Sequence, residues 1–235
     1  MSIRKIWRAI VYRLCNLVWP VVSLFGSKAK FAFVYRMNLW GNPESASGDG
    51  STMEYTANLR KMLPELFKRY GITKVIDAPC GDYNWFRHVA REDVSYLGGD
   101  IVNSLVNENR RKYGDALTDF LFFDISNSTF PSVDLWICRD CMFHLPTRDV
   151  KAALENFSQS GVDYILATSH IDTKENIDLP RTGFRMLNLE LPPYNLPTPE
   201  YSIDDWIPGF PRRIMGLWRR EDVVEAVANW NQEIE

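Results

Sequence analysis

Short apolar runs recur at regular intervals through the middle of the chain, and the first of them is rich in β-branched residues. The five runs begin at Thr73, Tyr96, Phe120, Val133 and Val162. The first three starts are 23 and 24 residues apart, which leaves room for a helix after a strand. Strands that alternate with helix-length segments are typical of β-α-β units, so the pattern predicts a parallel sheet. Further strands are predicted near residues 184–191 and 213–218.

Each of the first three apolar runs ends in an acid, namely Asp77, Asp100 and Asp124. The carboxyl ends of parallel strands meet at one edge of the sheet, where open α/β proteins bind their ligands. Gly81 follows the first run and provides a turn where the backbone can approach a ligand closely. The chain has neither the Gly-x-Gly-x-x-Gly fingerprint nor a Walker-type Gly-Lys-Ser/Thr. The predicted ligand is therefore something other than a pyrophosphate.

A single aspartate at the end of a strand is more often a turn former or a helix cap than a ligand-binding group. The matching spacing of Asp77 and Asp100 favours a binding role for this pair. Asp124 is followed by Ser126 and Ser128, so an ordinary turn explains it equally well. Two of the three acids therefore carry the prediction of a ligand site.

The segment Asp77-Ala-Pro-Cys-Gly-Asp82 resembles the first motif of the class I S-adenosylmethionine-dependent methyltransferases. Pro79-Cys80 stands where that family more often has Gly-Cys. The resemblance implies an α/β fold with a Rossmann-like, mostly parallel sheet of about seven strands flanked by helices. It also implies S-adenosylmethionine as the cofactor.

The chemistry of that cofactor suggests a task for each acid. Asp100 would accept the two ribose hydroxyls, and Asp124 would accept the adenine amino group while Ile125 packs on the ring. Asp77 and Asp82 would face the sulfonium and ammonium charges. The other expected cofactor-binding residues are Pro79, Cys80, Gly81, Trp85, Ile101 and Arg139.

The fourth run leads into a segment that contains Arg139, Asp140 and His144. Methyl transfer to a hydroxyl needs an aligned acceptor and a group that removes its proton. His144 is the best candidate for this base, with His170 after the fifth run and Asp140 as further catalytic candidates. Each has a structural alternative: the histidines could shape the pocket, and Arg139 and Asp140 could pair with each other.

No metal site is predicted. Cys138-x-x-Cys141 lacks a second pair or histidine ligands at suitable spacing, so reduced thiols are the simpler interpretation. The 235 residues are 46% hydrophobic and 24% charged, which suits one globular domain with a full core.

Residues 1–30 contain six Lys or Arg and no acid, so the rest of the chain carries a net charge of −9. Apolar residues between positions 3 and 18 recur at helical spacing, which predicts a basic amphipathic helix. It could lie on an anionic membrane surface or a partner through residues 1–25, or pack on its own domain. No segment there is long enough to span a bilayer.

The remainder, 31–235, is predicted to be a single methyltransferase domain. Its parts are a lid and first helix (38–70), a cofactor-binding core (71–170) and an acceptor side (171–235). The acceptor side begins with a segment rich in proline and aromatic residues, which is interpreted as an insertion. The predicted acceptor-binding residues are Tyr55, Arg181, Arg185 and Tyr194.

Several motifs together resemble a bacterial methyltransferase group associated with surface-polysaccharide biosynthesis. They are Trp40-Gly-x-Pro-Glu-Ser, Ser-Gly-x-Gly-Ser-Thr, Asp77–Asp82, Phe184-Arg-x-Leu-Asn-Leu and Gly216-Leu-Trp218. The resemblance implies a cytoplasmic O-methyltransferase, peripheral at the membrane if its leader docks there, acting on a sugar or a sugar-linked phosphate-type acceptor. Alternatives are an RNA or protein methyltransferase, another small-molecule acceptor, and a non-catalytic scaffold. The acidic body argues against a nucleic-acid partner, and the oligomeric state stays open.

Overall fold

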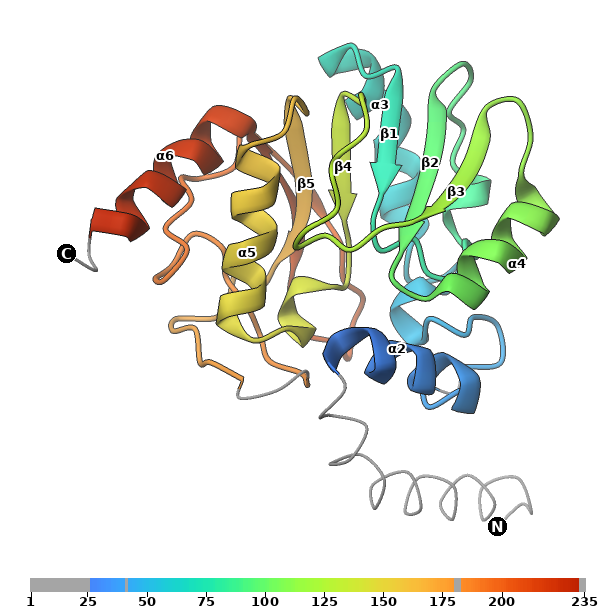
Figure 1. The fold of residues 1–235 in the computed structure, drawn as a ribbon, viewed down its shortest axis with the longest axis horizontal. Coiled ribbons are helices and arrows are strands. Elements are labelled where there is room, and N and C mark those ends of the chain that lie inside the picture. Colours follow the sequence, from blue (N-terminus) through green and yellow to red (C-terminus); the bar gives the residue numbers. More distant parts are fainter. Residues whose placement is uncertain (1–25, 41, 180–182, 233–235) are drawn as a thin grey trace.

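The computed structural model describes residues 26–232 except 41 and 180–182. Its centre is a sheet of seven strands in the order β3-β2-β1-β4-β5-β7-β6 (Figure 1). The strands are β1 (Lys74–Asp77), β2 (Ser95–Asp100), β3 (Thr118–Phe122), β4 (Leu135–Cys138), β5 (Tyr164–Ser169), β6 (Tyr201–Asp204) and β7 (Ile214–Arg219). The first five are parallel, whereas β7 runs antiparallel to both β5 and β6. The predicted fold class is thus confirmed.

Helices flank the sheet and are joined to it by short loops (Figure 1). They are α2 (Gly26–Met37), α3 (Ala57–Tyr70), α4 (Asn103–Tyr113), α5 (Thr147–Ser158) and α6 (Arg220–Gln232). Short 3-10 turns lie at Asp49–Ser51, Phe86–His88 and Met142–His144. Within the described part of the chain, no helix has the length and apolarity needed to cross a membrane.

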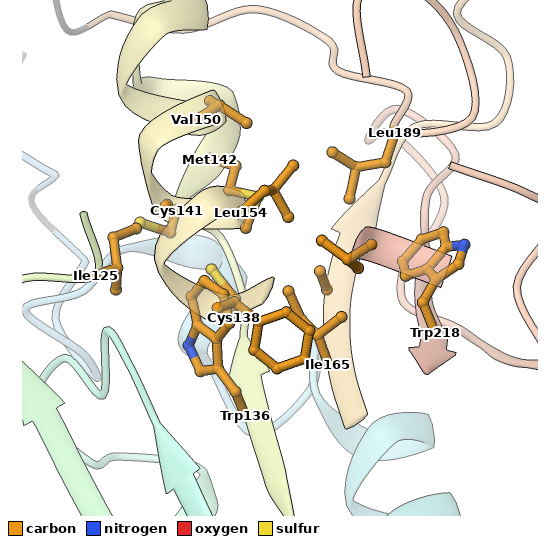
Figure 2. Close-up of a cluster of buried hydrophobic side chains, with 14 of the residues drawn as sticks. Ile125, Trp136, Cys138, Cys141, Met142, Val150, Leu154, Ile165, Leu189 and Trp218 are labelled. Carbon is orange, nitrogen blue, oxygen red and sulfur yellow. The ribbon is translucent and has the colours of Figure 1, made fainter. Parts of the chain in front are cut away.

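Alternation of side chains along the central strands produces one hydrophobic core on each face of the sheet. Trp136 and Ile165 pack with α5 and α6, while Leu135 and Leu166 pack with α3. Figure 2 shows the first core, in which Leu154 of α5 faces the strand residues. Because β1, β4 and β5 are buried on both faces, their nearly continuous apolar sequence is the one expected for parallel strands.

The prediction of a strand over residues 184–191 is wrong. Both edges of β5 are occupied, by β4 and by β7, so the segment cannot pair with the strand that it follows in the chain. Its backbone bonds to scattered partners instead of a ladder. Asn188 N donates to Asn176 Oδ1 at 2.9 Å, Leu189 N donates to Ser169 Oγ at 3.0 Å, and the Leu187 carbonyl oxygen accepts from His170 N at 2.7 Å. The sixth strand is β6, which forms a hairpin with β7 at the end of the sheet.

The predicted boundary between leader and domain at residue 30 falls inside α2. Phe31 of that helix packs against the core around α5, and Lys30 and Val34 are buried. The predicted amphipathic helix in residues 1–25 lies outside the described residues. The structure therefore extends the folded body of the protein back to at least Gly26.

Candidate active site

A cavity of about 400 Å³ lies at the carboxyl ends of β1, β2 and β4. Ten of the eleven predicted cofactor-binding residues line it: Asp77, Pro79, Cys80, Gly81, Trp85, Asp100, Ile101, Asp124, Ile125 and Arg139. Asp82 is the exception. The residues that were predicted from the spacing of the strand ends therefore lie around one cavity.

Asp100 occupies the last position of β2 and is only 3% exposed. Its carboxylate accepts hydrogen bonds from the backbone N–H groups of Val102 at 2.9 Å and Gly81 at 3.2 Å. Burial raises the pKa of Asp100 to about 6, against the opposing effect of these donors. Gly81 adopts φ 56°, and a Cβ there would collide with Ser47. Only glycine allows the backbone to run so close to the cavity wall.

Asp77, at the end of β1, is 2% exposed and accepts a hydrogen bond from the hydroxyl of Tyr96 at 2.9 Å. Burial raises the pKa of Asp77 to about 7. The hydrogen bond from Tyr96 and the charge of Arg139 oppose this rise only in part. Two acids with raised pKa values thus face one cavity, where a cation or hydroxyl donors would favour their ionised forms.

Asp124 lies two residues beyond β3, and it both forms a turn and lines the cavity. Its carboxylate accepts hydrogen bonds from Ser126 N at 3.0 Å and Asn127 Nδ2 at 3.3 Å, so it forms a turn. It also lines the cavity beside Ile125 and Ser126. An adenine-binding role stays a prediction, and the turn does not exclude it, because each carboxylate oxygen has a second lone pair.

The cavity is covered by α2 and by the loop that follows it. Phe31, Tyr35, Trp40 and Ser47 all line it, although none of them was predicted to bind the cofactor. Phe31 and Tyr35 stand four residues apart, the spacing that places two side chains on one helix face. This aromatic pair is the signal in the sequence that identifies α2 as part of the cover.

Asp82 lies outside the cavity lining and holds the lid loop instead. Its carboxylate accepts hydrogen bonds from Ser45 Oγ at 2.9 Å, Ala46 N at 2.8 Å and Ser47 Oγ at 3.1 Å. Ser47 Oγ in turn accepts from Asp82 N at 3.0 Å and pairs with the Tyr35 hydroxyl at 2.9 Å. Asp82, which follows the turn at Gly81, therefore fastens residues 45–47 of the predicted lid to the end of β1.

Replacement of Asp82 by alanine is expected to loosen the lid. Each buried hydrogen bond to a charged group contributes about 1.5–3 kcal/mol, so the amides of residues 45–47 should exchange with solvent at least ~10-fold faster. Hydrogen–deuterium exchange of the peptide covering residues 42–52 measures this. Asp93→Ala, at an exposed position, is the matched control. Equal exchange in the two variants would contradict the role of Asp82 as the lid fastener.

Four charged side chains form a buried network beside the cavity. Arg139 binds Asp205 through two hydrogen bonds of 3.0 and 2.9 Å, and Arg213 binds Asp140 at 2.8 Å. Burial alone would raise the pKa of Asp140, but Arg139 and Arg213 lower it below its usual value. Asp140 therefore stays ionised and is a weak base. Arg139 and Asp140 also pair with each other, as the structural alternative predicted: Nη1 of Arg139 lies 3.4 Å from Oδ2 of Asp140. Both residues nevertheless line the cavity.

Tyr55 joins this network rather than the cavity lining. Its ring lies 4.8 Å below the guanidinium of Arg213 and packs edge-on against Phe210 at 5.1 Å. Asp140 itself adopts φ 54°, a conformation that costs energy for a residue other than glycine. The charged network therefore joins three segments: the residues around Tyr55, the β6–β7 hairpin and the end of β4.

The two candidate histidines differ in their surroundings. His144 is partly exposed; its Nδ1 lies 2.6 Å from the carbonyl oxygen of Gly183, and its ring packs beside Trp40 at 6.1 Å. His170 is 2% exposed, and its Nδ1 contacts both backbone atoms of Leu187. Burial lowers the pKa of each. Neither lines the cavity itself, but His144 adjoins it through Trp40.

Arg185 and Tyr194 are buried away from the cavity and bond to each other at 2.9 Å. Arg185 also donates to the carbonyl oxygens of Leu145 and Ile177. The third predicted acceptor-binding arginine, Arg181, lies outside the described residues. The structure therefore supplies no free guanidinium from Arg139 or Arg185 for an acceptor phosphate.

The described residues include no group of three or more His, Cys, Asp or Glu side chains placed to hold a metal ion. Cys80, Cys138 and Cys141 are free and buried, and burial raises the pKa of Cys80 and Cys138. The raised pKa values keep the Cys80 and Cys138 thiols protonated at neutral pH, so these two are poor nucleophiles.

Comparisons with known proteins show which solved structures share this fold. No protein-family model matches the chain, and no curated protein matches it. Among solved structures, the chain is similar to magnesium protoporphyrin IX methyltransferase (ChlM) from Synechocystis PCC 6803 with bound SAH. The TM-score is 0.53 and the identity 13%, over 71% of this chain and 84% of that one.

Two further structures are similar to the same extent. The mitomycin 7-O-methyltransferase MmcR gives a TM-score of 0.52 at 14% identity, over 70% of this chain and 54% of that one. The N-methyltransferase NodS from Bradyrhizobium japonicum WM9 gives 0.50 at 10%, over 71% and 96%. The chain thus has the fold of the class I methyltransferases and spans about half the length of MmcR. Since O- and N-methyltransferases share this fold, it does not specify the acceptor atom.

Proposed function

We propose that the protein is an S-adenosylmethionine-dependent methyltransferase. The observation that carries the proposal is the pair of buried acids, Asp77 and Asp100, at the carboxyl ends of two adjacent parallel strands beside one cavity. A ribose presents two hydroxyl donors, and a sulfonium beside an ammonium group presents positive charge. S-adenosylmethionine carries both features, whereas a phosphate-bearing cofactor would be repelled by the same acids.

The residues around the cavity fit the parts of this cofactor in order. Asp100 is assigned to the ribose, Asp124 and Ile125 to the adenine, and Asp77 to the cationic methionine end. Arg139 also lines the cavity. Because its guanidinium is bonded to Asp205 and Asp140, we assign it a positive charge near the methionine carboxylate rather than a free pair of donors. Cys80 and Gly81 provide the close backbone wall between these parts.

S-adenosylmethionine supplies an electrophilic methyl group when it is bound. The chain must then align an acceptor oxygen and take its proton. A carbonyl oxygen cannot donate, so the contact with Gly183 means that His144 carries its proton on Nδ1 and keeps the Nε2 lone pair. Burial lowers the pKa of His144, which keeps the ring neutral at pH 7. We assign Nε2 as the base, with Asp140 as a nearby negative charge that favours the protonated ring.

A sugar hydroxyl is the acceptor that we favour, in keeping with the resemblance to surface-polysaccharide enzymes. Trp40 packs on one side of His144, and Phe184, which is 59% exposed, packs near it at 6.0 Å. Aromatic faces suit the CH face of a sugar ring. The engagement of Arg139 and Arg185 in internal bonds argues against the phosphate-type acceptor.

A basic face for nucleic acid would be built from Arg148, Lys151, Arg181, Arg185, Arg212 and Arg213, of which Arg181 lies outside the described residues. Arg185 and Arg213 are buried, Arg148 and Arg212 pair with aspartates, and Lys151 lies over the Trp230 ring at 4.7 Å. This dispersal supports the prediction that RNA is not the acceptor.

The deciding experiment is transfer from S-adenosylmethionine carrying a labelled methyl group to a panel of sugars, nucleotide sugars, phenols and RNA. We expect label on the carbohydrate acceptors, and a fall of ~100-fold or more in His144→Gln, because a general base contributes about 10²–10⁴. Binding of S-adenosylhomocysteine should change less than about threefold. His88→Gln, at an exposed histidine, is the matched control.

Three outcomes would sink parts of the proposal separately. Cofactor binding without transfer to any acceptor would favour the scaffold alternative. Label on RNA alone would show that RNA, not a carbohydrate, is the acceptor. Full activity in His144→Gln would show that His144 is not the base, while leaving the methyltransferase proposal intact.

We further place the protein in the cytoplasm, where its cofactor is made, with residues 1–25 as a contact to an anionic membrane surface or a partner protein. The uneven charge of the sequence supports this placement: the basic residues of the first 30 positions precede an acidic body.

A further inference from the structure

Residues 183–185 run beside the loop that carries the candidate base and are bonded to it along the backbone. Gly183 N donates to the His144 carbonyl oxygen at 2.9 Å, and Arg185 N donates to the Phe143 carbonyl oxygen at 3.1 Å. The side chain of His144 returns a bond to the carbonyl oxygen of Gly183 at 2.6 Å. We call residues 183–185 the strap. It touches both the backbone and the imidazole of His144.

Arg185 holds the strap in place from within the protein. Its guanidinium donates to Thr147 Oγ1 at 3.0 Å and to the Leu145 carbonyl oxygen at 2.9 Å. It also donates to the Ile177 carbonyl oxygen at 2.7 Å and to the Tyr194 hydroxyl at 2.9 Å. The side chain is 6% exposed and donates to four neutral oxygens; among the described residues, exposed Asp178 is the acid paired with it, at 3.5 Å. These bonds tie the strap to the residues that follow His144.

We propose that Arg185 is a positioning residue for His144: it anchors the strap so that the Gly183 carbonyl fixes the imidazole with its proton on Nδ1. Nε2 is then the nitrogen with the free lone pair. The catalytic consequence rests on the proposed function, but the tautomer does not. The sequence points to Arg185 as a phosphate-binding group, and its contacts assign it a different task.

The physical reason is the choice between two tautomers. A neutral imidazole carries one proton, and the partner of one ring nitrogen decides where that proton sits. Without the anchor, the strap would keep its backbone bonds to the loop and the packing of the Phe184 ring on Phe143, and the imidazole could rotate or exchange its proton. Either change would remove the lone pair from the position beside Trp40.

The test is nitrogen-15 NMR of the histidine rings across a pH titration, in wild type and in Arg185→Met. The chain has three histidines, so each ring can be assigned, and His88 is exposed and remote from the strap. We expect His144 to show the Nδ1–H tautomer in wild type. In the variant we expect mixed tautomers and a titration midpoint that moves up. Loss of burial, the larger cause of the lowered pKa of His144, should outweigh loss of the Gly183 hydrogen bond, which raises that pKa.

The other groups that face His144 are Asp140, which raises its pKa, and Arg213, which lowers it; both remain in the variant. Arg212→Met is the matched control, since Arg212 is exposed and pairs only with Asp172 at 3.6 Å among the described residues. Arg185→Lys keeps the charge with fewer donors and serves if the methionine variant does not fold. Binding of S-adenosylhomocysteine should change less than about twofold, because Arg185 does not line the cavity.

An Nε2–H tautomer of His144 in wild type would overturn the proposal without any variant. So would an unchanged tautomer and midpoint in a folded Arg185 variant. Neither result depends on methyl transfer, so a failure here and a failure of the enzymatic proposal are told apart. With an acceptor in hand, the expected kinetic signature is a fall in kcat of about 10- to 100-fold with KM for the cofactor unchanged.

Discussion

Replacement of Asp100 by alanine is expected to weaken binding of S-adenosylmethionine and S-adenosylhomocysteine by ~100-fold or more. The carboxylate is buried at the end of β2 and is assigned to two ribose hydroxyls. Hydrogen bonds to a charged group contribute about 1.5–3 kcal/mol each, and about 1.4 kcal/mol is a factor of ten. Isothermal titration calorimetry with both ligands measures the loss.

The matched control is Asp119→Ala, because Asp119 lies on the neighbouring strand but is largely exposed and pairs with Arg110 at the surface. Asp100→Ala also removes the acceptor for the N–H groups of Gly81 and Val102. Asp100→Asn keeps the shape and one acceptor oxygen, so it separates lost binding from local distortion. If both variants, Asp100→Asn and Asp100→Ala, fold and bind with wild-type affinity, the assignment of Asp100 to the ribose hydroxyls is wrong.

The acids at the ends of β1 and β2 could be predicted from the sequence because strand ends are fixed by local patterns. A short apolar run that ends in an acid places that acid at the carboxyl end of its strand, and after β1 the turn at Gly81 marks the end as well. Parallel pairing then brings Asp77 beside Gly98 of β2, two residues before Asp100. Local pattern and sheet geometry together therefore specify this half of the site.

The other half could not be predicted because it depends on contacts between distant segments. Asp82 looks like a ligand-binding acid by position, yet its partners are 35 to 37 residues away in the lid. Arg185 looks like an anion-binding group, yet it meets Leu145 across 40 residues. The irregular backbone of 184–191 bonds to side chains such as Asn176 and to the backbone of distant residues such as Phe143, and an apolar pattern encodes neither kind of partner. Charged residues of this kind show their role only when their partners are known.

The affinity for S-adenosylmethionine is expected to fall by ~100-fold or more as the pH is lowered from 8 to 5. In the ligand-free protein, burial raises the pKa of Asp77 to about 7 and that of Asp100 to about 6. The cofactor binds the ionised forms, because its hydroxyls donate to Asp100 and its positive charge faces Asp77. Binding is therefore at full strength above pH 7, and below each pKa a proton must be displaced. Each group costs up to about tenfold for each pH unit below its pKa.

Asp77→Asn tests how this dependence is divided. Asparagine keeps an acceptor for the Tyr96 hydroxyl but cannot ionise, so only the step near pH 6 from Asp100 should remain. In wild type, S-adenosylhomocysteine lacks the sulfonium charge, and its affinity should vary less with pH than that of S-adenosylmethionine. Calorimetry at pH 5, 6, 7 and 8 with both ligands measures the slopes. Equal slopes for the two ligands would place the sulfonium away from Asp77, and an affinity that rises toward pH 5 would show that the protonated acids are the binding forms.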